Sequence, residues 1–227
     1  MSSSYLTLAQ KLRQEVGVSG TGPSAVTSQT GMLAKIVNWV ADANDDICSK
    51  WLDWGFLHTE HTVNTIVGTK DYSVPSDFGI WDQDSFYLDR TASTYKKLMP
   101  MDYWYWRDAL RNGSKTNAKP DYVIIKPNKA IILEAPPDAI YSLTADYYKT
   151  ETRLSGNTAT SSIPTKFDRI IICRAKIYYA EHENAPEVME NALNEYNDLL
   201  NKLESLYLPE QEPRTRSSNN NMVTIPE

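Results

Sequence analysis

Hydrophobic residues recur at helical spacing near both ends of the chain and at strand spacing in between. Within residues 1–55, apolar positions step by three and four, which predicts a short and a longer amphipathic helix. The short stripe is Tyr5, Leu8, Leu12 and Val16; the longer one is Leu33, Ile36, Val37, Val40, Ala43, Ile47, Trp51 and Trp54. Gly17 is expected to end the first helix and Thr30 to cap the second.

After Gly55 the hydrophobic period changes to two, which is typical of strands with one buried face. Strands are expected within residues 56–74, 86–88, 95–99, 119–126, 130–134 and 140–149. This gives six or seven strands, which we expect to be antiparallel. Residues 127–129 have the composition of a hairpin turn between two of them, and a short helix is expected over residues 102–111.

The helical period returns near the C-terminus. Pro164 and Pro186 suit the first turns of two helices, where a missing backbone N–H costs nothing. The second of these helices has a narrow apolar seam, formed by Met189, Leu193, Tyr196, Leu200 and Leu203. Helices from both ends of the chain can therefore pack on one another, with the strands as an insertion.

The fold expected from these patterns is α+β, in four parts. N-terminal helices (residues 1–55) and C-terminal helices (residues 163–208) form a bundle. An antiparallel β-rich domain (residues 56–150) is inserted between them. Residues 209–227 form an extended C-terminal arm, because a segment with only three apolar residues cannot bury enough surface to fold alone.

The arm has the composition of a segment that binds a partner. Arginine is favoured at protein interfaces, and short apolar stretches can fill a partner's pockets or add a strand to its sheet. We therefore expect the arm to bind a partner or a neighbouring copy of the chain. The candidate binding residues are Pro209, Arg214, Arg216, Met222, Val223 and Ile225.

Charge and cysteine content narrow the function classes. The formal net charge is -6, which argues against a protein that grips nucleic acid through its phosphates. Cys48 and Cys173 are far apart and read as reduced core thiols. The sequence has neither a signal-peptide pattern nor an apolar run of membrane-spanning length, so we expect synthesis in a cytoplasm and no membrane partner.

The most distinctive chemistry is aromatic. The chain has 14 Tyr and 6 Trp, and Tyr103, Trp104, Tyr105 and Trp106 are consecutive. On a helix Tyr103 and Trp106 share a face. We expect one pair to cover the β core and the other to contact a neighbour. The alternative is a carbohydrate- or receptor-binding module that uses Trp104 and Trp106.

No catalytic, metal or cofactor site is predicted. His58 and His61 are three residues apart on a strand, so they point to opposite faces and cannot share one ion. His182 suits a solvated helix end. The glycines match neither the dinucleotide-binding nor the phosphate-loop spacing. An enzyme is therefore the least favoured class.

An ordered set of segments resembles the head-to-tail adaptor (connector) proteins of tailed bacteriophages. No one of these segments is specific, but together they cover most of residues 5–185. They lie at residues 8–23, 29–31, 36–43, 72–78, 135–141, 146–148 and 163–167.

The resemblance implies a structural virion protein without catalytic residues, made in the host cytoplasm. Its copies would form a ring, usually a dodecamer, in the neck of the virion. That ring would join the portal protein of the capsid to a tail nozzle or tail-tube protein. Double-stranded DNA would pass through its centre during packaging and ejection without specific binding, and the C-terminal arm would run along the portal.

Overall fold

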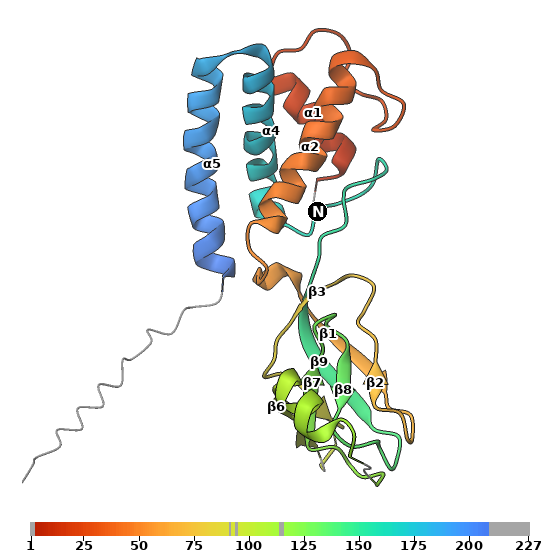
Figure 1. Ribbon diagram of the computed structural model, residues 1–227. Coiled ribbons are helices and arrows are strands. Elements are labelled where there is room, and N and C mark those ends of the chain that lie inside the picture. The colour runs from red at the N-terminus through yellow and green to blue at the C-terminus, as the bar shows by residue number, and fades with distance from the viewer. Residues whose placement is uncertain (1–2, 91, 94, 114–115, 209–227) are drawn as a thin grey trace, which may run out of the picture.

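The computed structural model describes residues 3–90, 92–93, 95–113 and 116–208. Figure 1 shows a helical region, made of α1, α2, α4 and α5, above a β region that holds all the strands and α3. The expected α+β class is confirmed. The expected arm, residues 209–227, lies outside the described residues.

Four helices build the helical region: α1 (Tyr5–Glu15), α2 (Gly31–Ser49), α4 (Asp168–Glu183) and α5 (Pro186–Tyr207). Helix α4 packs against the other three, and α1 also packs on α2. Segments more than a hundred residues apart in the sequence therefore share one hydrophobic core.

Local sequence signals explain most helix boundaries. The Ser4 side chain caps α1 by accepting a hydrogen bond from the Thr7 N–H. Gly17 follows the end of α1 with φ +69°, a conformation that favours glycine. Thr30 is at the N-cap position of α2 but makes no capping hydrogen bond through its side chain. Pro186 starts α5, as expected.

The expectation that Trp51 and Trp54 lie on the second helix is wrong, because α2 ends at Ser49. Trp54 is fully buried, and its indole N–H donates to the carbonyl of Ile47 at 3.1 Å. Trp51 remains 42% exposed and donates to Glu204 on α5. Both side chains still contact the helical region from the loop after α2. Their spacing therefore continued the apolar pattern of the helix beyond its end.

The β region contains two sheets. One has the order β1-β9-β4-β5, with β3 also paired to β9, and the other has the order β2-β8-β7-β6. The strands are β1 His58–Asn64, β2 Asp71–Tyr72, β3 Phe78–Trp81, β4 Tyr87–Leu88, β5 Lys96–Lys97, β6 Met99–Met101, β7 Tyr122–Ile125, β8 Ile131–Leu133 and β9 Ser142–Lys149.

The strand predictions need three corrections. The described residues contain nine strands rather than six or seven. Residues 56–74 divide into β1 and β2, which belong to different sheets. Strand β6 pairs with β7 in parallel, whereas all pairs were expected to be antiparallel. The β7–β8 hairpin across residues 127–129 is confirmed, with Lys129 in the left-handed conformation at φ 69°.

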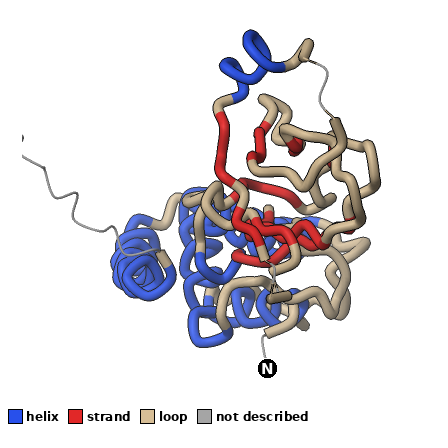
Figure 2. The backbone as a smooth tube through the Cα atoms, turned by 90° about the horizontal axis from the view of Figure 1, so that it is seen from below, coloured by secondary structure: helices blue, strands red, loops and turns tan. Residues whose placement is uncertain are grey.

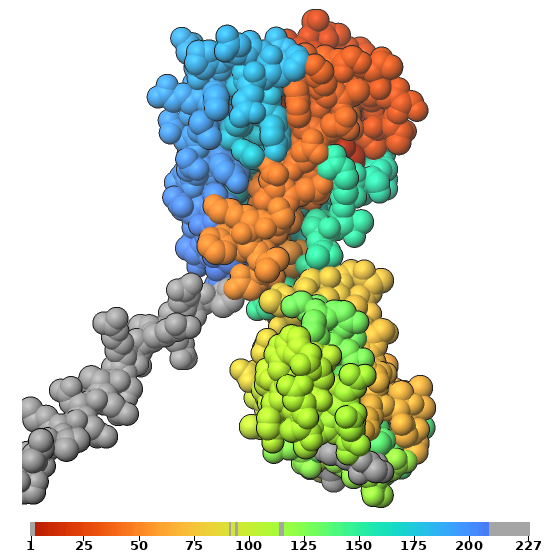
Figure 3. Space-filling model, viewed as in Figure 1, coloured from red at the N-terminus to blue at the C-terminus, as the bar shows by residue number. Residues whose placement is uncertain are grey.

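Each region has its own main hydrophobic core, and no residue belongs to both. The chain crosses between the regions twice, near Gly55 and near Arg153, and Figure 3 shows the molecule narrowing there. Figure 2, seen from below, shows the strands gathered in front of the helices. The domain boundaries stated above stay a prediction.

The Asn44 side chain is a weak point of the helical core. It is 0% exposed, and neither its Oδ1 nor its Nδ2 has a hydrogen-bond partner among the described residues. Because a buried unpaired amide is costly, Asn44→Leu is expected to raise the free energy of unfolding by about 1–2 kcal/mol. Urea denaturation measures this change. The control is the same substitution at exposed Asn38 on the same helix, Asn38→Leu. A lower unfolding free energy for Asn44→Leu would contradict the prediction.

Candidate protein-interaction surface

The aromatic segment forms one short helical unit at the edge of the β region. Helix α3 (Tyr103–Tyr105) continues directly into a π-helical turn, Trp106–Leu110. The Asp102 carboxylate caps this unit by accepting a hydrogen bond from the Tyr105 N–H at 2.8 Å. An aspartate at this position also suits the positive end of the helix.

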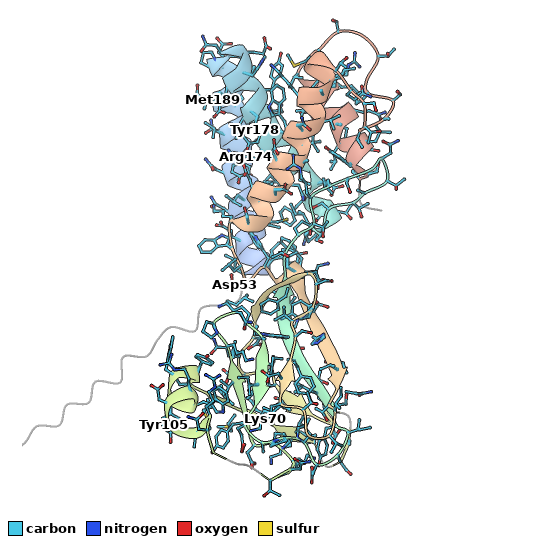
Figure 4. The ribbon with its side chains drawn as sticks, turned by 45° about the vertical axis from the view of Figure 1, so that its right-hand side comes forward. Asp53, Lys70, Tyr105, Arg174, Tyr178 and Met189 are labelled. Atoms are coloured by element: carbon cyan, nitrogen blue, oxygen red, sulfur yellow. The ribbon has the colours of Figure 1, made fainter. Side chains whose placement is uncertain are left out.

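The unit has a buried and an exposed face. Trp106 is 9% exposed and packs with Ile124 and Ile132, and Tyr103 packs against the same small cluster. Trp104 and Tyr105 are 53% and 59% exposed. Figure 4 shows Tyr105 on this outer helical turn of the β region. The sequence placed Tyr103 and Trp106 on one face correctly; whether Trp104 and Tyr105 bind a partner stays a prediction.

Arg107 and Tyr103 contact the exposed ring of Trp104 and order it. The Arg107 guanidinium lies 4.3 Å from the centroid of the Trp104 ring, within the range of a cation–π contact. The edge of the Tyr103 ring meets the same indole, with ring centroids 5.3 Å apart. Trp104 is therefore exposed but ordered by its neighbours, which lowers the entropy cost of binding a partner through it.

A groove runs beside this unit and is not apparent from the sequence. Its volume is about 380 Å³, and it is lined by Gln83, Pro100, Met101, Asp102, Tyr103, Trp104, Val123, Ile125, Lys126, Pro127 and Lys129. Except for Gln83 in the loop between β3 and β4, these residues come from β6, the start of α3, β7 and the hairpin turn. The parallel pairing of β6 with β7 brings them together, so a search for local motifs could not find the groove.

Two other exposed apolar groups were also missed. Trp51, Leu52 and Leu206 lie at the junction of the two regions, and Ile66, Val67 and Ile140 lie on loops of the β region. A cavity of about 260 Å³ opens beside Trp51 and Leu52 and is lined on its other side by Gly79 and Lys149. Apolar surface at separate places is typical of a protein with more than one partner.

The charged groups between the helices are structural. Arg174 and Tyr178 both lie on α4 (Figure 4). Arg174 donates to Asp46 on α2 at 2.9 Å, and the Tyr178 hydroxyl also donates to Asp46. Burial, followed by this hydrogen bond, raises the pKa of Tyr178 to about 12. Tyr178 therefore stays protonated at neutral pH and serves as a hydrogen-bond donor that joins α4 to α2.

The histidines and cysteines do not converge on a site. His58 is exposed, whereas His61 on the opposite face of β1 contacts the rings of Trp81 and Tyr147. The described residues hold no group of three or more side chains suited to a metal ion. Cys48 and Cys173 are buried free thiols, as expected, and burial raises the pKa of both.

The second set of candidate residues cannot be placed. Pro209, Arg214, Arg216, Met222, Val223 and Ile225 all lie outside the described residues. What is described is the point from which they start: Leu208 follows α5 and lies beside Gly55, His58 and Tyr148. The last described residue, Leu208, therefore lies at the junction of the two regions.

The chain matches the model of a known protein family. A family model described as SU10 adaptor protein matches residues 3–223. A search of the curated proteins finds no match. Among the described residues, no helix combines the length and the apolar character needed to cross a membrane.

The two faces of the aromatic unit can be separated by mutation. Trp106→Ala is expected to lower the free energy of unfolding by about 3–5 kcal/mol, because it empties a packed site. Trp104→Ala is expected to lower it by less than about 1 kcal/mol, since it removes an exposed ring and a surface cation–π contact. Guanidinium denaturation of both variants tests this; equal destabilisation would show that Trp104 is part of the core.

His61 gives the β region a pH dependence. Burial lowers the pKa of this imidazole from 6.5. The folded state therefore binds this proton less readily than the unfolded chain does. The contribution of neutral His61 to the unfolding free energy is fully present above pH 6.5 and is lost as the pH falls through the lower folded-state pKa. His61→Gln is therefore expected to flatten the pH dependence of the unfolding free energy between pH about 7 and about 5. Exposed His58→Gln is the control, and unchanged curves for both variants would refute the prediction.

Proposed function

The chain belongs to the SU10 adaptor protein family of phage head-to-tail adaptors, and from that membership we propose that it is a structural subunit of the ring that joins the capsid portal to the tail. The observation that carries the proposal is the extent of the family match, residues 3–223. It includes the helical region and the β region together. The proposed location is therefore the neck of the virion.

The two-region organisation supports a joining role. A subunit between portal and tail needs separate surfaces for its neighbours, for the portal and for the tail. The chain has exposed apolar side chains at the junction, on loops of the β region and on the aromatic unit. We propose that the four helices form a bundle on the portal side and that the β region faces the tail nozzle or tail tube.

The charge of the chain supports passage of the genome without binding. A ring of subunits, each with a net charge of -6, carries a large negative charge. If the acidic face of each subunit points into the channel, it repels the phosphates of double-stranded DNA, which favours sliding over retention. The proposed role is that of a channel wall without catalytic activity.

The arm is proposed to fasten the subunit to the portal. At about 3.3 Å per residue, its nineteen residues can reach roughly 60 Å from the end of α5. Arg214 and Arg216 can pair with acidic groups of the portal, and Met222, Val223 and Ile225 can fill apolar pockets. A polar segment of this kind orders as it wraps a partner.

A carbohydrate- or receptor-binding role remains the second candidate, because Trp104 and Tyr105 are exposed. Aromatic rings bind sugars by stacking on them. Glycan-array binding that disappears in Trp104→Ala would support this role, and the absence of any glycan binding would remove it.

Deletion of residues 209–227 tests the proposed attachment. The shortened chain keeps both hydrophobic cores, so it is expected to fold with an unchanged unfolding free energy. Its occupancy on portal-containing heads is expected to fall by about tenfold or more, since the arm supplies the wrapping contacts. Co-sedimentation with purified heads measures this.

The Asn64→Ala chain serves as the control for this experiment, because it keeps the arm and alters only an exposed side chain of β1 outside the groove. It is expected to sediment with the heads like the unaltered chain. Full occupancy by the shortened chain would contradict the role of the arm.

A further inference from the structure

The groove beside Trp104 fits a segment of this same chain. We propose that residues 209–213 of one copy, Pro-Glu-Gln-Glu-Pro, bind in this groove on an adjacent copy of the ring. The inference rests on the proposed ring and adds a specific contact between its subunits. It concerns the first part of the arm and leaves residues 214–227 for the portal.

The groove combines aromatic, apolar and basic groups. Its lining residues include the aromatic side chains of Tyr103 and Trp104 and the rings of Pro100 and Pro127. Buried Val123 and half-buried Ile125 supply an apolar floor. Surfaces of this kind bind extended, proline-containing segments. A proline ring can stack on an aromatic side chain, and proline has no backbone N–H that binding would leave unpaired.

Charge favours an acidic occupant. Lys126 and Lys129 of the hairpin turn both line the groove, and Lys129 is exposed. Lys126 also pairs with Asp71, and Asp102 is the single carboxylate among the lining residues. Arg107 lies next to the groove, over Trp104.

The segment at residues 209–213 has the matching composition. Proline restricts the backbone of an unbound chain, so the prolines at its two ends, Pro209 and Pro213, reduce the entropy that the segment loses when it binds. Glu210 and Glu212 lie between them and carry the charge opposite to that of Lys126 and Lys129. No other part of the arm joins acidic residues to two prolines in this way.

The proposed occupant comes from another copy. Pro209 is bonded to Leu208, which lies beside Gly55, His58 and Tyr148 at the junction. The groove is built on the other sheet, from β6, β7 and α3, and shares no lining residue with that place. We therefore assign the segment to the groove of a neighbouring copy, which a ring can present to the end of α5.

Such a contact suits a closed ring. Each copy donates one segment and accepts another, so the two surfaces differ and the contact repeats from subunit to subunit. A short acidic segment binds weakly when free. In the ring its tether raises its local concentration, so the groove is occupied without high intrinsic affinity.

Disulfide trapping in assembled particles tests the contact. Gln83 is exposed at the groove and Gln211 is the central residue of the segment, so Gln83→Cys and Gln211→Cys are combined in one chain. Mild oxidation is expected to give a ladder of covalent multimers on a denaturing gel. The two native cysteines are buried and do not compete.

A matched pair, Asn64→Cys with Gln211→Cys, places the first cysteine on exposed β1 of the other sheet and is expected to give no ladder. A ladder from this pair as well, or none from the first pair in particles that contain the chain, would overturn the proposal. Particles in which the unaltered chain forms no ring would instead overturn the proposed function, so the two failures can be distinguished.

A charge exchange gives a second readout in the same particles. Lys129→Glu, added to the Gln83→Cys and Gln211→Cys chain, is expected to reduce the cross-linked fraction by up to about fivefold, because an exposed ion pair contributes at most about 1 kcal/mol. Adding Glu212→Lys is expected to restore it. Equal cross-linking with and without Lys129→Glu would show that charge does not guide the segment into the groove.

Discussion

The arrangement of this molecule depends on a narrow junction between two hydrophobic cores that have no residue in common. At one crossing Gly55 lies against the end of α5, where an added Cβ would be 3.0 Å from the carbonyl oxygen of Tyr207. At the other crossing Arg153 donates to both Asp42 and Asp45 of α2. Because the two main hydrophobic cores have no residue in common, contacts at the junction such as these hold the β region beneath the helices.

The junction also organises the surfaces available to partners. Trp51, Leu52 and Leu206 are exposed there, and the arm starts there. The aromatic unit and its groove are displaced from this point, on the far sheet of the β region. A subunit with its arm at one place and a groove at another is suited to contacts that pass from one copy to the next. The same separation leaves the outer surfaces free for portal and tail.

The sequence predicted the elements that are set by residues close together in the chain, namely the helices and one hairpin. The three- and four-residue stripes identified α1, α2 and α5, and turn composition identified the β7–β8 hairpin. The end of α2 was missed because Trp51 and Trp54 keep helical spacing while contacting the core from a loop. Strand β3 was missed because it contains Gly79, which permits close approach to the Tyr148 carbonyl but weakens a strand pattern. The exposure of Trp104 followed from helix geometry, but the groove beside it depends on the non-local β6–β7 pairing.

The claim on which the account depends is that many copies of this chain form a closed ring between portal and tail. Native mass spectrometry of the neck complex, isolated from intact particles with its portal, measures the copy number directly. The account predicts a single species in which this chain is present in a fixed, symmetric number of copies, twelve if the resemblance to dodecameric adaptors holds. A neck complex that lacks the chain, or holds only one or a few copies of it, would contradict the account.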